Sequence, residues 1–173
     1  ILNSKKDELS QEILYKTQKE LIYSSNTKIS SKLDVGISNA VSIVNDSMIQ
    51  KALIENNRDL AITAISSLSS NMKKSTPFKN IKIHIHTKEN KSFLRSWKES
   101  KYGDDLSSFR GSVVKVNKTL KPVNTFEVGK AGLSIRSVVP ILNGDTHLGS
   151  LEFMQGINSV AKQFDKNKDA FIL

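Results

Sequence analysis

The sequence predicts an α+β protein in which a long N-terminal helix precedes a five-stranded antiparallel sheet. Two observations predict this class. Apolar residues before Pro77 recur mainly at helical spacing, and the proline closes that half of the chain. After Pro77 the pattern changes to an alternation of apolar and polar residues, which is typical of strands.

A single long helix is expected over residues 5 to about 45, because its apolar positions form one stripe and no proline interrupts it. The residues of the stripe are Leu9, Ile13, Leu21, Ile29, Leu33, Ile37, Val41 and Val44. At 1.5 Å per residue, this helix would extend roughly 60 Å, which is typical of a spine or a dimer seam. Shorter helices are predicted over 47–57 and 58–74. We therefore expect residues 1–77 to be a helical, dimerising part.

The strands are expected after residue 78. A hairpin is predicted over 80–97, on both sides of the turn "KENK". A helix is expected next, over 103–122, with Asp104 or Asp105 as its N-cap. Three strands follow, "VNTFEVG", "GLSIRSVVPIL" and "HLGSLEFMQG", separated by the turn-like "GKAG" and "NGDT". Residues 157–168 are predicted to be helical, and the tail "DAFIL" is expected to begin another strand.

Composition and the absence of motifs exclude several classes of function. The chain has 173 residues, a net charge of +9 and no cysteine. A basic chain suits nucleic acid, anionic lipid or an anionic ligand. Aromatic residues make up only 6% and the lysines are dispersed, so we expect no nucleic-acid partner. The absence of cysteine excludes disulfides and zinc–thiolate sites. Because the sequence has neither a glycine-rich phosphate loop nor a nucleophile motif, we expect no enzyme and no cofactor.

The first candidate site lies in "SFLRSWKESKYGDDLSSFR", residues 92–110. In an extended segment, Phe93, Arg95 and Trp97 would project from one face, and Arg110 follows nearby. An arginine between aromatic walls can bind a carboxylate through two hydrogen bonds. The alternative interpretation is that both aromatic residues pack in the core while Arg95 extends to solvent.

A second candidate is Arg136, which interrupts the apolar run of its strand. A buried arginine needs a partner, and Glu127 on the preceding strand is the obvious one. The pair is interpreted either as purely structural or as part of a ligand site.

His84 and His86 form an H-x-H pair on one face of a strand. Two imidazoles at this spacing can share a metal ion, but the sequence offers no clear third ligand beyond His147. We therefore predict no metal site, and we expect the two histidines to line the same pocket as Arg95.

Three segments carry a family resemblance: "FLRSWKESKYGDDLSSFR", "VNTFEVGKAGLSIRSVVPI" and "HLGSLEFMQGINSVAKQF". Together they resemble the extracellular Cache sensor domains, most closely the double-Cache type of methyl-accepting chemotaxis proteins, sensor histidine kinases and diguanylate cyclases. The resemblance implies a PAS-like fold in a periplasmic part of a membrane-anchored receptor that dimerises along its long helix. It also implies a pocket for small carboxylates or amino acids between the sheet and its covering helix.

The resemblance places Arg95 and Trp97 on the strand that supplies ligand contacts and Arg110 on the covering helix. Phe126, Glu127 and Arg136 fall on the strands that face that helix. Because the family's amino-acid signature has several spaced tyrosines and Tyr102 is the only tyrosine of this half, the sequence favours a simple carboxylate.

We therefore expect residues 78–173 to be the ligand-binding module of a transmembrane chemoreceptor, followed by a second module. The arginines would bind the anion, and Phe93, Trp97 and Phe126 would form the pocket walls. The alternatives are the sensor domain of a histidine kinase or diguanylate cyclase, and a structural module without its own ligand.

Overall fold

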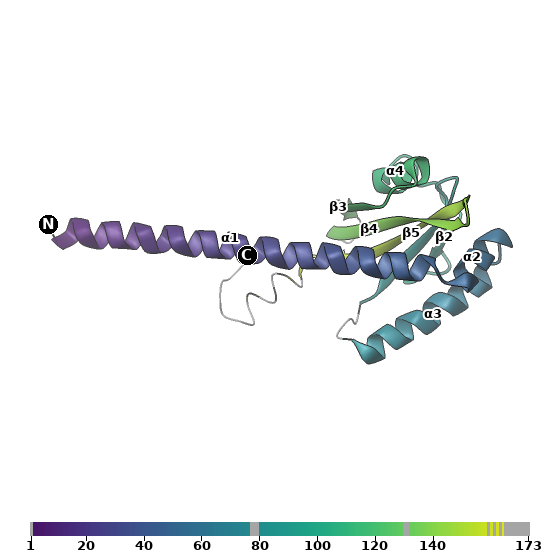
Figure 1. The fold of residues 1–173 in the computed structure, drawn as a ribbon, viewed down its shortest axis with the longest axis horizontal. Helices are drawn as coiled ribbons and strands as arrows, with labels where there is room; N and C mark the ends of the chain where they lie inside the picture. The colour runs from purple at the N-terminus through teal and green to yellow at the C-terminus, as the bar shows by residue number, and fades with distance from the viewer. Residues whose placement is uncertain are drawn as a thin grey trace. The chain divides into compact units, whose positions relative to one another are not determined.

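The computed structural model describes residues 2–76, 80–129, 132–158, 160, 162 and 164. A long helix and two shorter ones precede a five-stranded antiparallel sheet, with one more helix between the second and third strands (Figure 1). The elements are α1 (Leu2–Val44), α2 (Ser47–Ile54), α3 (Arg58–Ser75), β1 (Lys82–Thr87), β2 (Ser92–Arg95), α4 (Gly111–Thr119), β3 (Val123–Gly129), β4 (Gly132–Asn143) and β5 (Thr146–Gly156). The predicted α+β class is confirmed.

The chain forms two compact units. One comprises residues 1–32 and 157–173, and the other comprises residues 33–156. In the first unit, residues 4–20 of α1 are exposed throughout. The second unit holds the sheet, and residues 33–44 of α1 contribute Ala40, Ile43 and Val44 to its core.

The sheet has the strand order β2-β1-β5-β4-β3, and all neighbours are antiparallel. Helix α4 packs on one face, against β3, β4 and β5. Helices α2 and α3 pack on the opposite face, as Figure 1 shows. Because both faces are covered, the central strands β1 and β5 are buried along most of their length, and polar residues on them need partners inside the protein.

The apolar core lies on the face that α2 and α3 cover. Ile83, Ile85, Leu151 and Phe153 of the two central strands pack there against the helices. Because side chains alternate along a strand, the intervening residues of β1 and β5 project toward α4. Those residues include His84, His86 and Glu152, so the sheet separates an apolar layer from a polar one.

Side-chain caps define where the short helices begin. The Asp46 carboxylate accepts hydrogen bonds from the backbone N–H groups of Met48 and Ile49 at the start of α2. Asn57 does the same for Asp59 and Leu60 at the start of α3. These contacts satisfy N–H groups that the first helical turn leaves unpaired.

Two predictions about the helices need correction or fall outside the described chain. Helix α4 begins at Gly111, with Arg110 at its N-cap and no side-chain cap, so neither Asp104 nor Asp105 caps it. Asp105 instead accepts a hydrogen bond from the backbone of Ser107 in the preceding turn. Of the predicted helix 157–168, residue 157 is a turn and residues 158, 160, 162 and 164 are helical; the others and the tail 169–173 lie outside the described residues.

Candidate functional site

A row of polar side chains crosses the α4 face of the sheet. Arg95 in β2 pairs with His84 in β1, and His84 pairs with Glu152 in β5. Directly paired residues project from the same face, so these three side chains lie side by side. With the residues that contact them they form what we call the charged cluster: His84, His86, Arg95, Asp104, Arg110, Glu127, Arg136 and Glu152.

Arg95 is bound to Asp104 through two hydrogen bonds. Its Nη1 donates to Asp104 Oδ1 at 2.6 Å and its Nη2 to Oδ2 at 2.8 Å, while Nη1 also donates to the Lys101 carbonyl. The Arg95 hydrogen bond holds the pKa of Asp104 below its ordinary value. Only 9% of the Arg95 side chain is exposed, so the interpretation in which it extends to solvent is wrong.

Arg110 and Arg136 share two carboxylates. Arg136 Nη1 donates to Glu152 Oε1 at 2.7 Å, and its Nε lies 3.5 Å from Glu127 Oε2. Arg110 Nη1 donates to Glu127 Oε2 at 3.2 Å and lies 3.9 Å from Glu152 Oε1. The predicted Glu127–Arg136 pair is present, but the shorter contact of Arg136 is to Glu152. Glu127 also accepts a hydrogen bond from the backbone N–H of Ser112, which ties β3 to the start of α4.

The two histidines are fully buried beside Glu152. His84 Nε2 is hydrogen-bonded to Ser92 Oγ at 2.8 Å, and His86 Nδ1 to Ser150 Oγ at 3.0 Å. Burial lowers the pKa of both imidazoles well below their ordinary value, and nearby positive charges act in the same direction. Both rings are therefore neutral near pH 7.

Trp97 lies at the edge of the cluster, where 40% of its surface is exposed. Its ring packs edge-on against His84, with the ring centroids 5.7 Å apart. Trp97 therefore contacts the cluster through His84.

Phe93 does not share the face of Arg95, contrary to the strict alternation predicted for this strand. The pairing of β1 with β2 shifts by one residue, so that Leu94 opposes Ile85 and Ser92 opposes His86. Such a bulge adds one unpaired residue and changes the side to which it points. Phe93 therefore packs in the apolar core with Leu94.

Phe126 also lies away from the cluster. It pairs with Ile135, one position removed from Glu127, and is 42% exposed. Its neighbour Asn124, on the same face of β3, donates a hydrogen bond to the Leu33 carbonyl of α1. Phe126 is therefore on the face opposite to α4, and it cannot form a wall beside the three arginines.

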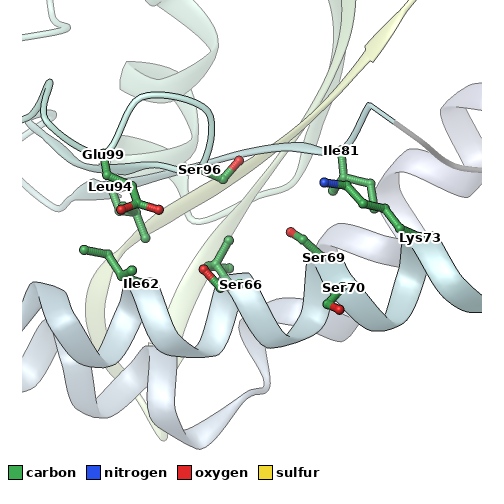
Figure 2. Close-up of a pocket in the computed structure, with 10 residues that line it drawn as sticks. Ile62, Ser66, Ser69, Ser70, Lys73, Ile81, Leu94, Ser96 and Glu99 are labelled. Atoms are coloured by element: carbon green, nitrogen blue, oxygen red, sulfur yellow. The ribbon is translucent and has the colours of Figure 1, made fainter.

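A cavity of about 340 Å³ lies on that opposite face, between α3 and the edge of the sheet (Figure 2). Three serines, Ser66, Ser69 and Ser70, and Lys73 line it from α3, while Leu94, Ser96 and Glu99 line it from β2 and the following turn. None of the residues predicted for the site lines this cavity, and it is separated from the charged cluster by the sheet.

Sequence reasoning missed Glu152, Ser92, Ser150 and the role of Asp104. Glu152 lies within the apolar run "LEFM", and a carboxylate at such a position signals a buried partner in the same way as Arg136 does. Asp104 carries no comparable signal, because its partner Arg95 is reached only through the loop between β2 and α4. His147 lies apart from the cluster, with its Nε2 2.9 Å from the Gly149 carbonyl oxygen.

Solved structures with the same fold include sensor domains and a ligand-binding domain of a chemoreceptor. The sensor domain of the histidine kinase DctB of V. cholerae matches with a TM-score of 0.68 and 13% identity, covering 88% of this chain and 59% of that chain. The ligand-binding domain of the Campylobacter jejuni chemoreceptor Tlp3, in complex with 4-methylisoleucine, matches with a TM-score of 0.63 and 14% identity, covering 87% and 62%. The E. coli DcuS sensor domain matches with a TM-score of 0.55 and 13% identity, covering 77% and 97%.

These likenesses establish the fold, and this chain spans about three fifths of the DctB sensor domain. No curated protein sequence matches the chain significantly. Among the described residues, no helix is both long enough and apolar enough to cross a membrane. The sequence profile of the dCache_3 family, described as a double sensory domain of two-component sensor kinases, matches residues 15–170. Since this match includes most of the chain, the protein belongs to the dCache_3 family of double sensory domains.

Proposed function

We propose that the charged cluster is the ligand-binding site of this sensory domain and that its ligand is a small carboxylate. The observation that carries the proposal is the convergence of three arginines, Arg95, Arg110 and Arg136, on one face of the sheet. They come from β2, the N-terminus of α4 and β4. Guanidinium groups are well suited to carboxylates, because they can donate two parallel hydrogen bonds.

Asp104 would be the group that the ligand displaces. It already occupies Arg95 in the two-hydrogen-bond geometry that a bound carboxylate would adopt, and 34% of its side chain is exposed. The residues from Trp97 to Gly103 are exposed as well, so the segment that carries Asp104 lies next to solvent. A ligand that replaces Asp104 would break its side-chain contact with Arg95 and favour a second position of this side chain, while backbone hydrogen bonds to Ser92 still hold Gly103 and Asp104. Only such differential affinity for two arrangements transmits a signal.

Trp97, His84 and His86 would line the site, since they lie beside Arg95. Glu127 and Glu152 keep Arg110 and Arg136 in place in the absence of ligand. With three arginines and three carboxylates, the cluster also has groups for a ligand ammonium. The DctB, DcuS and Tlp3 sensor domains of related fold support a role in sensing small molecules.

The whole receptor would place this domain outside the cell, on the periplasmic side of a membrane anchor, and pair two copies through α1. Exposed apolar side chains on the first unit support the pairing; they are Leu9, Ile13, Leu14, Tyr15, Ile22 and Tyr23. We propose a chemoreceptor as the parent protein, with no catalytic activity in this domain. A sensor kinase is the second candidate, because the description of the family names that class.

The proposal is tested by calorimetry with a panel of short mono- and dicarboxylates and amino acids, on protein freed of metal with a chelating resin. At least one compound should bind the wild type. Arg110→Gln should weaken that binding by roughly tenfold or more, because a charge-assisted hydrogen bond contributes about 1.5–3 kcal/mol. The double variant Arg95→Gln/Arg110→Gln should show no measurable binding.

Lys118→Gln is the control. Lys118 is an exposed cation in the last turn of α4 and is not a member of the charged cluster. This variant should keep the affinity of the wild type. Equal affinity of the wild type and the double variant for the same carboxylate would exclude the cluster as the binding site.

A further inference from the structure

Three buried atoms in the charged cluster face one another. They are Nδ1 of His84, Nε2 of His86 and Oε2 of Glu152. The three residues can each offer one ligand atom such that these atoms lie within 4.8 Å of one another. The carboxylate oxygen is 3.5 Å from His84 Nδ1 and 4.0 Å from His86 Nε2. All three side chains have 0% exposure.

Each side chain has its other polar atom engaged. His84 Nε2 is held by Ser92, His86 Nδ1 by Ser150 and Glu152 Oε1 by Arg136. Among the described residues, the three inward-facing atoms have no hydrogen-bond partner. Separations of 3.5 and 4.0 Å are too long for good hydrogen bonds, and unpaired buried polar groups are costly. Three atoms that can bind metal therefore face one another at high energetic cost.

We propose that His84, His86 and Glu152 bind a divalent transition-metal ion of the zinc class. Metal–ligand bonds of about 2.0–2.2 Å place the ligand atoms of a tetrahedral site about 3.3–3.6 Å apart. The observed separations reach this range with side-chain movements below about 1 Å. Two imidazoles and one carboxylate favour zinc, nickel or copper over magnesium and calcium, which prefer oxygen ligands.

The three side chains also have the hydrogen bonds that commonly orient metal ligands. A ligating imidazole commonly has its second nitrogen hydrogen-bonded, which sets the ring orientation and the tautomer. Ser92 and Ser150 supply these contacts, and Arg136 orients the carboxylate.

Charge determines which fourth ligand is expected. The three arginines and three carboxylates of the cluster balance in charge, so a divalent ion adds positive charge close to Arg136 and Arg110. The fourth coordination position is therefore expected to hold a small anion, which offsets part of that charge.

The test uses the full chain, with any affinity tag removed and bound metal stripped by a chelating resin. Zn²⁺ is titrated calorimetrically, and Co²⁺ is followed by the visible absorption of four-coordinate cobalt. We expect one equivalent of each to bind. His86→Gln and Glu152→Gln should weaken binding by more than tenfold, because loss of even an outer contact typically costs 10–100-fold.

His147→Gln is the matched control, since it removes the remaining histidine and leaves the three proposed ligands intact; its affinity should equal that of the wild type. Ser150→Ala keeps both imidazoles and should weaken binding by roughly tenfold, which preserves the test if a ligand variant does not fold. The proposal is overturned if the wild type binds neither ion, or if circular dichroism shows the two ligand variants to be folded and they bind as the wild type does. Carboxylate binding is measured on metal-free protein, so the failure of one proposal leaves the other standing.

Discussion

Glu152 is the residue on which most contacts of the charged cluster converge. Its carboxylate lies 2.7 Å from Arg136, 3.9 Å from Arg110 and 3.5 Å from His84, and it is fully buried. A buried ion pair contributes little net stability against an apolar pair of equal size, but breaking it leaves a charge without a partner. The effects of substituting Glu152 and Arg136 on stability are therefore expected to be strongly coupled.

The first prediction is a double-mutant cycle on metal-free protein. Arg136→Met and Glu152→Leu should each lower the free energy of unfolding by about 3–5 kcal/mol, because each leaves one buried charge behind. The double variant should lose less than the sum of the two, by at least about 1 kcal/mol. Urea denaturation measures all four proteins, and strictly additive losses would refute the coupling.

The second prediction concerns Asp104, whose hydrogen bonds from Arg95 lower its pKa. A carboxyl group with a lower pKa in the folded state stabilises the fold above its unfolded pKa of about 4, and this contribution is lost as the pH falls through the folded value. The melting temperature of the wild type should exceed that of Asp104→Asn at pH 6. The difference should shrink toward pH 3, and a difference that is constant with pH would argue against the pair.

At the scale of the elements, strand register decided which of the residues predicted for the site lie close together. The predicted hairpin correctly brought His84 opposite Arg95, and alternation placed His84 and His86 on one face of β1. The bulge opposite Ile85 and His86 moved Phe93 to the apolar core, and a bulge has no clear signal in "SFLRSW". Helix α4 begins later than predicted, because Asp104 is engaged by Arg95 rather than by a helix N-terminus.

The third prediction tests the close approach of β1 and β5 at Gly149. A Cβ atom added there would collide with the backbone carbonyl of His86. Since a backbone cannot yield as a flexible side chain does, Gly149→Ala should lower the free energy of unfolding by about 1–3 kcal/mol. Gly156→Ala, at the end of the same strand, meets nothing within 4 Å and should stay within about 0.5 kcal/mol of the wild type in urea denaturation.

At the scale of the whole molecule, the sheet unit and the first half of α1 have different surroundings. Residues 4–20 are exposed, whereas Ala40 and Ile43 are buried in the core of the second unit. A helix whose apolar residues are exposed is only marginally stable in water, since helices in proteins obtain most of their stability from packing. This contrast is consistent with the proposed pairing of two copies through α1.

The fourth prediction follows from this contrast. A chain that begins at Ser24, and so lacks all six exposed apolar residues named for the pairing, should keep the circular-dichroism spectrum of the sheet and a similar unfolding midpoint in urea. It should also sediment as a monomer at concentrations at which the full chain is dimeric. Ile43→Ala, made in the full chain, should instead cost about 2–5 kcal/mol of stability. Persistent dimerisation of the shortened chain would place the interface elsewhere.

The sequence by itself determined the class of the fold and the order of its elements, which depend on apolar periodicity and on turn residues, both local properties of the chain. The sensor-domain family followed from the resemblance of three segments to known sequences. The sequence also determined that Arg136 is buried with Glu127 nearby. Only the tertiary structure decided that Asp104 binds Arg95, that Phe93 and Phe126 lie on the other face, and that Glu152 completes a triad with His84 and His86. Such contacts join residues up to 68 positions apart (84 to 152), and they depend on strand register and loop path, which no local pattern encodes.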